Sequence, residues 1–144
     1  MAGLGIRLEA GDRMILNGAG IHFLTPTQIR LTNRANFLFG RQIMPPEEAT
    51  TPSRLIYYAL QTAYVGTPEE RVTALTEAIY HITAFMQETT SMSAKLLLSE
   101  GMKAASEGNF YKALKIARRI IRHEDAVLEQ VAAFPVESEK PEAL

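Results

Sequence analysis

The sequence predicts an α+β fold, in which a small N-terminal antiparallel β-sheet or partial barrel is followed by a helical unit of about four helices. Before residue 44, short apolar segments alternate with polar residues and are separated by Gly, Asn and Pro, as in short strands. After residue 52, every apolar pattern has a helical period. Pro45 and Pro46 separate the two regions, because proline cannot donate to a β-ladder. We therefore expect the last strand to end near Met44 and the first helix to begin at Pro52.

These patterns divide the chain into a predicted β-rich subdomain over residues 1–46, a helical subdomain over residues 47–134 and a flexible tail over residues 135–144. The tail is predicted from its polar composition. The 144 residues include no cysteine, which excludes a disulfide, a thiolate metal site and a cysteine nucleophile. Apolar runs of signal-peptide or membrane-spanning length are missing, so we expect a cytoplasmic protein without membrane contact.

Four or five strands are predicted in the first part, because turn residues separate five short segments. They are Gly5–Glu9, Arg13–Asn17, Ile21–Leu24, Gln28–Thr32 and Phe37–Phe39. In the fourth segment Ile29 and Leu31 fall on one face, whereas Arg30 and Thr32 fall on the other. Alternation of this kind is typical of an antiparallel sheet with one solvated face. We expect that face to be basic.

Capping signals predict where the helices begin. Thr51 precedes a proline and is expected to cap the first helix. Thr67 and Glu70 form the capping-box pattern at the start of the second helix. Two further helices are expected over about residues 93–105 and 109–134.

Apolar residues of the second and fourth helices predict how these helices pack. Five apolar residues of the second helix repeat at steps of three and four and predict a buried seam. They are Val72, Leu75, Ile79, Ile82 and Met86. The apolar stripe of the last helix runs from Phe110 through Leu114 and Ile121 to Val127, Leu128 and Val131. We expect the seam and this stripe to face each other.

Positive charge gathers in two stretches, although the net charge of the chain is only −1. Residues 1–44 hold five arginines and two acids, a local charge of +3, and residues 103–122 hold six basic residues and one acid, a local charge of +5. Sorting of this kind can present basic surface to a polyanion. A solvated helix face is the simpler explanation from sequence alone.

The basic stretch from Gly108 to Arg122 has three interpretations. With the preceding helix it has the pattern of a single tetratricopeptide-like hairpin, which would pack or bind peptides, although no second copy follows. Its basic face could instead attract phosphates, or it could be solvated and nothing more. The four cations expected opposite the apolar stripe are Lys112, Lys115, Arg119 and Arg122.

Three tyrosines of the first helix suggest a further surface. Tyr57 and Tyr64 are expected to lie half-buried along the flank of its apolar stripe, whereas Tyr58 should project beside Arg54 and Gln61, away from the stripe. A tyrosine next to an arginine is typical of base-stacking and partner-binding surfaces, and it is also common on ordinary protein surfaces.

The sequence contains no recognisable catalytic constellation. His22, His81 and His123 are far apart, and none has a neighbour at metal-ligand spacing. The glycines near residue 18 lack the lysine and the following helix of a phosphate-binding loop. We therefore expect a non-enzymatic protein without a metal or another cofactor.

Three stretches carry a resemblance to a known family: Arg7–Gly18, Ile43–Tyr57 and Gly108–Arg118. Over almost its full length the chain resembles FlbT, the flagellar biosynthesis repressor proteins of alphaproteobacteria. The resemblance implies post-transcriptional control of flagellin, by association with the 5′ untranslated region of flagellin mRNA and an effect on its translation or decay, in concert with FlaF. Some family members act positively, so the resemblance leaves the sign of regulation open.

A shorter likeness, from Gly11 through Gln28–Leu31 to Ile43, is similar to the strand pattern of the mRNA-binding regulator CsrA. It favours contact between the sheet and RNA, whose sequence is usually read in single-stranded loops. The residues hypothesised to bind RNA are Arg7, Arg30, Arg34 and Arg41 in the first half and Lys112, Lys115, Arg118, Arg119 and Arg122 in the last helix.

The competing function is a protein-interaction module or chaperone-like adaptor. In this interpretation the helical half binds FlaF or flagellin, and effects on the mRNA are indirect. The residues hypothesised to contact a partner are Arg54, Tyr57 and Tyr58. The sequence leaves open whether the protein forms a homo-oligomer.

Overall fold

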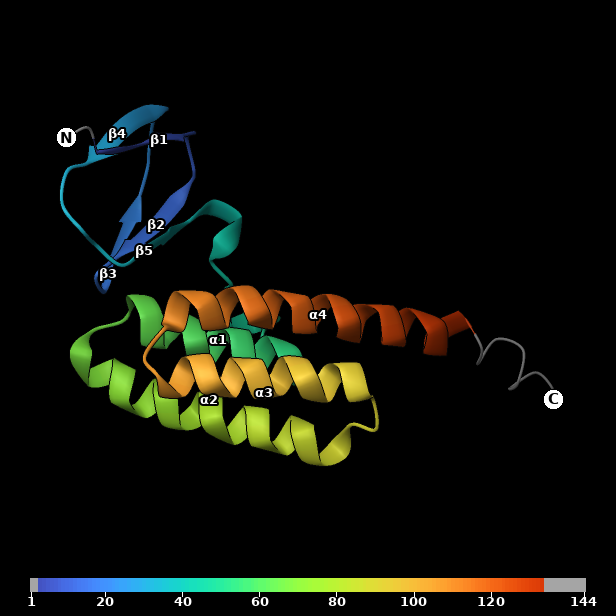
Figure 1. Ribbon diagram of the computed structural model, residues 1–144. Coiled ribbons are helices and arrows are strands. Elements are labelled where there is room, and N and C mark those ends of the chain that lie inside the picture. The colour runs from blue at the N-terminus through green and yellow to red at the C-terminus, as the bar shows by residue number, and fades with distance from the viewer. Residues whose placement is uncertain (1–2, 134–144) are drawn as a thin grey trace.

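The structure is a computed structural model that describes residues 3–133, with two small antiparallel sheets beside four helices (Figure 1). The predicted α+β fold is confirmed. The strands are β1 (Leu4–Leu8), β2 (Arg13–Leu16), β3 (Ala19–His22), β4 (Thr27–Leu31) and β5 (Phe37–Phe39). The helices are α1 (Pro52–Val65), α2 (Pro68–Glu88), α3 (Met92–Ser106) and α4 (Phe110–Ala133). The predicted tail at residues 135–144 lies outside the described residues.

The five strands form a two-stranded ribbon, β1–β4, and a three-stranded sheet in the order β3-β2-β5. The hairpin between β2 and β3 turns at Asn17 and Gly18, whose φ angles are 48° and 88°. A two-residue hairpin turn of type I′ needs positive φ at both central positions, which explains the Asn-Gly pair. Ile6 and Leu8 of the ribbon and Met14 of the larger sheet form a buried apolar cluster.

The link between sheet and helices differs from the prediction. β5 ends at Phe39 instead of near Met44, and two short 3₁₀ helices follow, η1 (Gly40–Gln42) and η2 (Pro46–Glu48). The backbone of Met44 pairs with the side chain of Gln61 on α1, and not with a strand. Its N–H donates to Gln61 Oε1 at 2.7 Å, and its carbonyl oxygen accepts from Gln61 Nε2 at 3.0 Å. The amide of a buried glutamine therefore satisfies the backbone that the sequence pattern assigned to the sheet.

The predicted caps of the first two long helices are confirmed. The Thr51 hydroxyl accepts the N–H of Arg54 at 3.3 Å. Thr67 and Glu70 bind each other reciprocally, at 3.2 Å from the Glu70 N–H to the Thr67 hydroxyl and at 2.9 Å from the Thr67 N–H to Glu70 Oε1. These contacts satisfy backbone donors that have no partner inside a helix.

The predicted packing of α2 is confirmed at Ile82 and is wrong for the seam as a whole. Its buried residues are Ala74, Ala78 and Ile82, whereas Val72 is 70% exposed. Leu75, Ile79 and Met86 are only partly buried. α2 packs against α1 and α3, and α4 also packs against α1 and α3, so the two predicted stripes do not face each other. Small side chains let helices approach closely, and this favours an alanine face over the more hydrophobic residues beside it.

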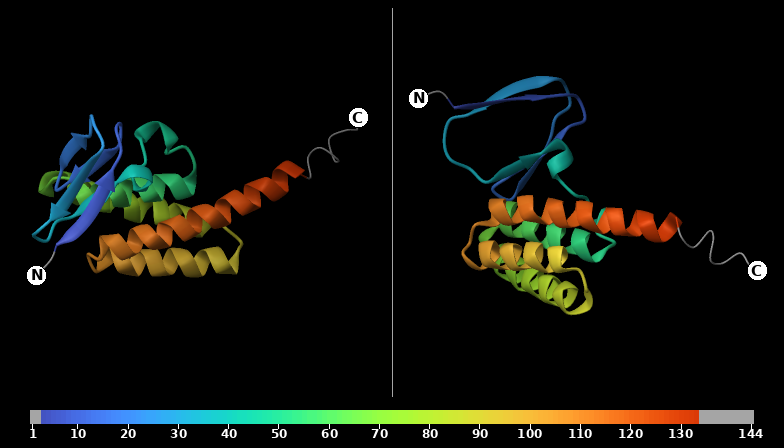
Figure 2. Two further views of the ribbon diagram at one scale, coloured as in Figure 1. Left: turned by 90° about the horizontal axis from the view of Figure 1, so that it is seen from above. Right: turned by 45° about the vertical axis from the view of Figure 1, so that its right-hand side comes forward.

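The end of α4 extends past the other helices (Figure 1). The sheets lie over the opposite end of the bundle, where α4 begins (Figure 2). Val127, Leu128 and Val131, which were predicted to be core residues, are 43%, 49% and 53% exposed. The prediction is wrong for these three because α1–α3 offer no surface to cover them. Within residues 3–133, no helix combines the length and apolarity needed to cross a membrane.

Candidate nucleic-acid interface

One exposed face of α4 combines an aromatic ring with several cations. Tyr111, Lys115 and Arg119 follow each other at intervals of four residues, and Lys112 lies beside them. All four side chains are exposed, with 43% exposure for Tyr111. They line a depression of about 460 Å³ between α3 and α4 together with Glu100, Asn109 and Ile116. We call Tyr111, Lys112, Lys115 and Arg119 the α4 face.

The ring of Tyr111 contacts one tyrosine of α1 and one lysine of α4. Its centroid lies 5.5 Å from that of Tyr64 on α1, and the Lys115 ammonium lies 5.2 Å from the Tyr111 centroid. A supported aromatic ring beside cations can stack a nucleobase and hold its phosphates. Sequence reasoning missed Tyr111, although its position one and two helical turns before Lys115 and Arg119 was a usable signal.

The remaining cations predicted on α4 differ in their surroundings. Arg122 is exposed further along the helix. Arg118 turns toward the bundle, where its guanidinium lies 5.3 Å from the ring centroid of Tyr57 and donates to the Tyr57 hydroxyl at 3.1 Å. It also reaches the carbonyl oxygen of Arg41 at 3.5 Å. Arg118 therefore joins α4, α1 and the η1 segment, while the Arg41 side chain stays exposed.

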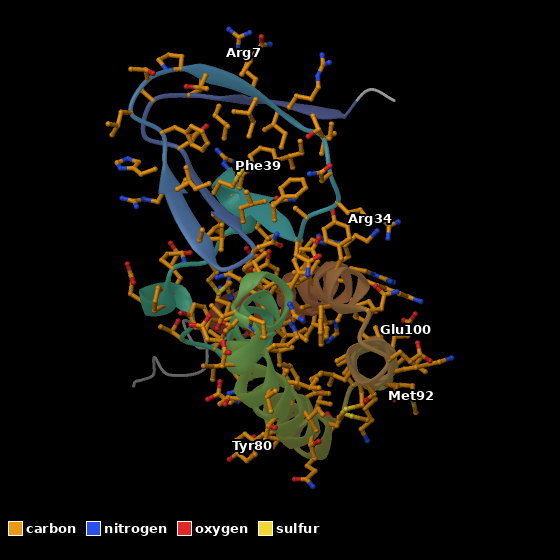
Figure 3. The ribbon with its side chains drawn as sticks, turned by 90° about the vertical axis from the view of Figure 1, so that its left-hand side faces the viewer. Arg7, Arg34, Phe39, Tyr80, Met92 and Glu100 are labelled. Atoms are coloured by element: carbon orange, nitrogen blue, oxygen red, sulfur yellow. The ribbon has the colours of Figure 1, made fainter. Side chains whose placement is uncertain are left out.

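The predicted arginines of the sheet do not form one site. Arg7 and Arg30 are exposed on the outer face of the ribbon, as the alternation predicts, where they pair with Gln28 and Gly5 of the opposite strand. Arg7 also lies 3.7 Å from Glu9. Figure 3 shows Arg7 pointing away from the molecule, whereas Arg34, in the loop after β4, lies beside the helices.

The residues hypothesised to contact a partner are mostly engaged inside the protein. Arg54 binds Asp125 through two hydrogen bonds of 2.9 and 3.0 Å. The hydrogen bond from Arg54 holds the pKa of Asp125 below its ordinary value. Tyr57 is 3% exposed instead of half-buried, and burial raises its pKa against the opposing effect of Arg118. Tyr58 is half-buried and lines a depression beside Ile15 of β2. Partner binding by these residues stays a prediction.

A buried contact that the sequence did not suggest lies next to Arg54. Ser53 is fully buried, and its N–H donates to Glu124 Oε2 at 3.1 Å while its hydroxyl donates to Glu124 Oε1. Glu124 of α4 is only 8% exposed. A carboxylate at a helix N-terminus binds free N–H groups and is favoured by the helix dipole. Glu124 thus caps α1 from a different helix.

Among residues 3–133, no group of three or more His, Asp or Glu side chains is arranged to hold a metal ion. The fold and its exposed side chains define a small α+β protein with a basic and aromatic helix face.

Comparisons with known proteins identify the family. The family model described as "Flagellar protein FlbT" matches residues 4–128. The chain therefore belongs to the FlbT family. No solved structure matches it.

Curated relatives match over most of their length. The "Flagellum biosynthesis repressor protein FlbT" of Caulobacter vibrioides is 30% identical over 139 residues, which cover 90% of this chain and 92% of the relative. A "Probable flagellum biosynthesis repressor protein FlbT" of Rhizobium leguminosarum bv. trifolii is 29% identical, covering 87% and 83%. One of Brucella abortus is 26% identical, covering 91% and 86%.

Proposed function

We propose that the protein regulates flagellum biosynthesis in the cytoplasm after transcription, by binding the 5′ untranslated region of flagellin mRNA and changing its translation or decay. The observation that carries the proposal is the α4 face, where Tyr111 lies among Lys112, Lys115 and Arg119. The names of the relatives support a role in repressing flagellum biosynthesis. The resemblance to FlbT supports flagellin mRNA as the target and a FlaF-like protein as a partner.

The chemistry of the α4 face suits single-stranded RNA. Its cations neutralise backbone phosphates, and its tyrosine offers a flat surface to an unpaired base. In double-stranded RNA the bases are stacked on each other and the major groove is too narrow for side chains. The exposed ring of Tyr111 therefore favours an unpaired segment of the leader.

Direct binding is tested with purified protein and flagellin leader RNA in a mobility-shift assay over a range of salt concentrations. Lys112→Gln with Arg119→Gln removes two charges from the α4 face. Arg13→Gln with Lys95→Gln is the matched control, because it removes one lysine and one arginine that are exposed elsewhere. Affinity falls as salt rises, and each single-strand phosphate contact contributes about 0.7 to the steepness of log affinity against log salt. We therefore expect the α4 variant to reduce this steepness by about 1.4. An equal slope for both variants, or no binding by the unchanged protein, would exclude the proposal.

A second function, as a protein-interaction module for a FlaF-like protein or flagellin, is favoured by the projecting end of α4. Val127, Leu128 and Val131 form an exposed apolar stripe there, and an amphipathic helix is a common recognition element. Leu128→Glu should abolish co-purification of the FlaF-like protein, while Gln130→Glu, at an exposed position two residues later, should preserve it. Retention of the partner by both variants would argue against this function.

A further inference from the structure

A second depression lies at the end of the ribbon where β1 begins and β4 ends. Its volume is about 340 Å³, within the range of about 300–1,000 Å³ that is typical of small-molecule sites. Leu4, Leu31 and Phe37 contribute apolar walls, and Thr32, Asn33 and Arg34 contribute a polar rim. Apolar walls with a few polar groups are what a flat heteroaromatic ligand requires.

The walls of this depression are held by close packing. A side-chain carbon on Gly3 would lie 1.9 Å from the carbonyl oxygen of Leu31, so only glycine lets the chain approach β4 this closely. The ring of Phe37 stacks on that of Phe39, with centroids 6.4 Å apart and an angle of 18° between the planes. Packing therefore fixes the backbone beside Leu31 and the ring of Phe37, while Leu4 is 54% exposed.

The polar groups at the rim have no partner among the residues that the structure describes. Across residues 3–133, no hydrogen bond or ion pair involves the side chain of Thr32, Asn33 or Arg34, and all three are exposed. An asparagine offers both a donor and an acceptor, and the guanidinium of arginine matches a phosphate. These are the groups needed to bind the edge of a base and the phosphate beside it.

The loop that carries this rim adjoins the α4 face. The Asn36 side chain donates to the carbonyl oxygen of Tyr64 at 3.0 Å, and the Tyr64 ring packs against Tyr111. Figure 3 shows Arg34 on the side of the sheet that meets the helices. Asn36 and Tyr64 therefore connect the loop that carries the rim to the α4 face. Arg7 and Arg30 lie on the outer face of the ribbon and do not line it.

We propose that the depression bordered by Leu4, Asn33 and Arg34 binds one unpaired nucleobase of the RNA strand held by the α4 face. This inference rests on the proposed function. The α4 face supplies phosphate and stacking contacts that any sequence satisfies, whereas the depression contacts a base edge. The preference of the protein for one RNA sequence over another therefore arises at the depression.

The test compares Leu4→Glu with Leu24→Glu. Both residues are exposed leucines of the sheet half, at 54% and 78%, but Leu24 precedes β4 at the opposite end of the ribbon. Both variants add one negative charge, and only Leu4→Glu places it at the depression. Asn33→Ala removes the amide without changing charge. Affinities are measured for flagellin leader RNA and for a scrambled RNA of the same composition, and amide resonances are followed while each of the four nucleoside 5′-monophosphates is added.

Leu4→Glu and Asn33→Ala should reduce the preference for leader over scrambled RNA by about three- to tenfold, as expected for one hydrogen-bonded contact. Leu24→Glu should leave the preference unchanged, and one monophosphate should shift the amides of residues 32–35 most strongly. If both leucine variants behave alike and no monophosphate shifts these amides, the depression is not a base site, while binding that depends on the α4 face still supports the proposed function. If the unchanged protein binds neither RNA, the proposed function and this inference both fail.

Discussion

Arg118 lies over the ring of Tyr57 and donates to its hydroxyl at 3.1 Å, while that hydroxyl in turn donates to the carbonyl oxygen of Gln42. The pair connects three parts of the chain that are distant in sequence: α4, α1 and the η1 segment after the last strand. One tyrosine hydroxyl therefore contributes to the attachment of the sheets to the helical bundle.

Tyr57→Phe should lower the free energy of unfolding by about 1–3 kcal/mol, because it leaves the Gln42 carbonyl and the Arg118 guanidinium without their partner. Tyr58→Phe is the matched control, since the structure shows no hydrogen bond of the Tyr58 hydroxyl within residues 3–133. Urea unfolding of both variants measures the difference. Equal losses would mean that the Tyr57 hydroxyl contributes nothing specific to the junction.

Glu124→Ala should cost about 2–4 kcal/mol, because the N–H and the hydroxyl of buried Ser53 lose their acceptor. Glu129→Ala removes an exposed carboxylate from the same helix and should change stability by less than about 0.5 kcal/mol. Thermal and urea unfolding compare the two. A small effect of Glu124→Ala would show that water can replace the carboxylate at the start of α1.

Asp125 makes stability depend on pH through its ion pair with Arg54. The pKa of Asp125 is lowered in the folded protein, so its contribution is present above its unfolded pKa of about 3.9 and is lost as the pH falls through its folded pKa. At neutral pH, Asp125→Asn should cost about 0.2–1 kcal/mol, since the carboxylate is partly solvated. Unfolding measured from pH 7 downward should show the difference shrinking in acid. A difference that stays constant would exclude the ion pair as its cause.

The face of α2 that is buried can be checked with two members of the predicted seam. Ile82→Ala should cost about 2–4 kcal/mol, because Ile82 is fully buried. Val72→Ala should stay within about 0.5 kcal/mol, because Val72 is 70% exposed. A large loss at Val72 in urea unfolding would place α2 in the orientation that the sequence pattern suggested.

Tyr111→Ala should weaken binding of flagellin leader RNA by about 1–3 kcal/mol without changing the salt slope, because it removes stacking and no phosphate contact. Tyr111→Phe keeps the ring and should bind almost normally. Fluorescence anisotropy with labelled RNA measures both affinities, and circular dichroism checks the fold. Weak binding by Tyr111→Phe would indicate that the hydroxyl, and not the ring, contacts RNA.

Much of the fold was predictable because its signals are local. Thr51 and Thr67 mark helix starts through contacts with residues three positions later, and the Asn17–Gly18 turn depends on its own backbone angles. The orientation of α2 was not predictable in this way. Hydrophobicity favours Val72 over Ala74, but the distance between neighbouring helices decides which residue is buried, and that distance is a tertiary property.

The candidate site was predictable in part for the same reason. The exposed cations of the α4 face follow from helical periodicity. The contact between Tyr111 and Tyr64 is made between two helices, so the sequence of neither helix indicates it. Arg118 turns inward because it contacts Tyr57, which is 61 residues away in the sequence. The sequence alone therefore does not show that Arg118 is missing from the exposed row of cations on α4.

Ser53 and Glu124 are 71 residues apart in the sequence, so their contact limits the order in which the helices can assemble during synthesis. A chain leaves the ribosome from its N-terminus, so α1 emerges well before α4. Until Glu124 has been synthesised, the N–H of Ser53 in the first turn of α1 lacks the carboxylate that it binds in the folded protein. The nascent helices can form and collide earlier, but α1 and α4 can be joined at this contact only after Glu124 has been made. The bundle is therefore completed only after α1, α2 and α3 have all been made.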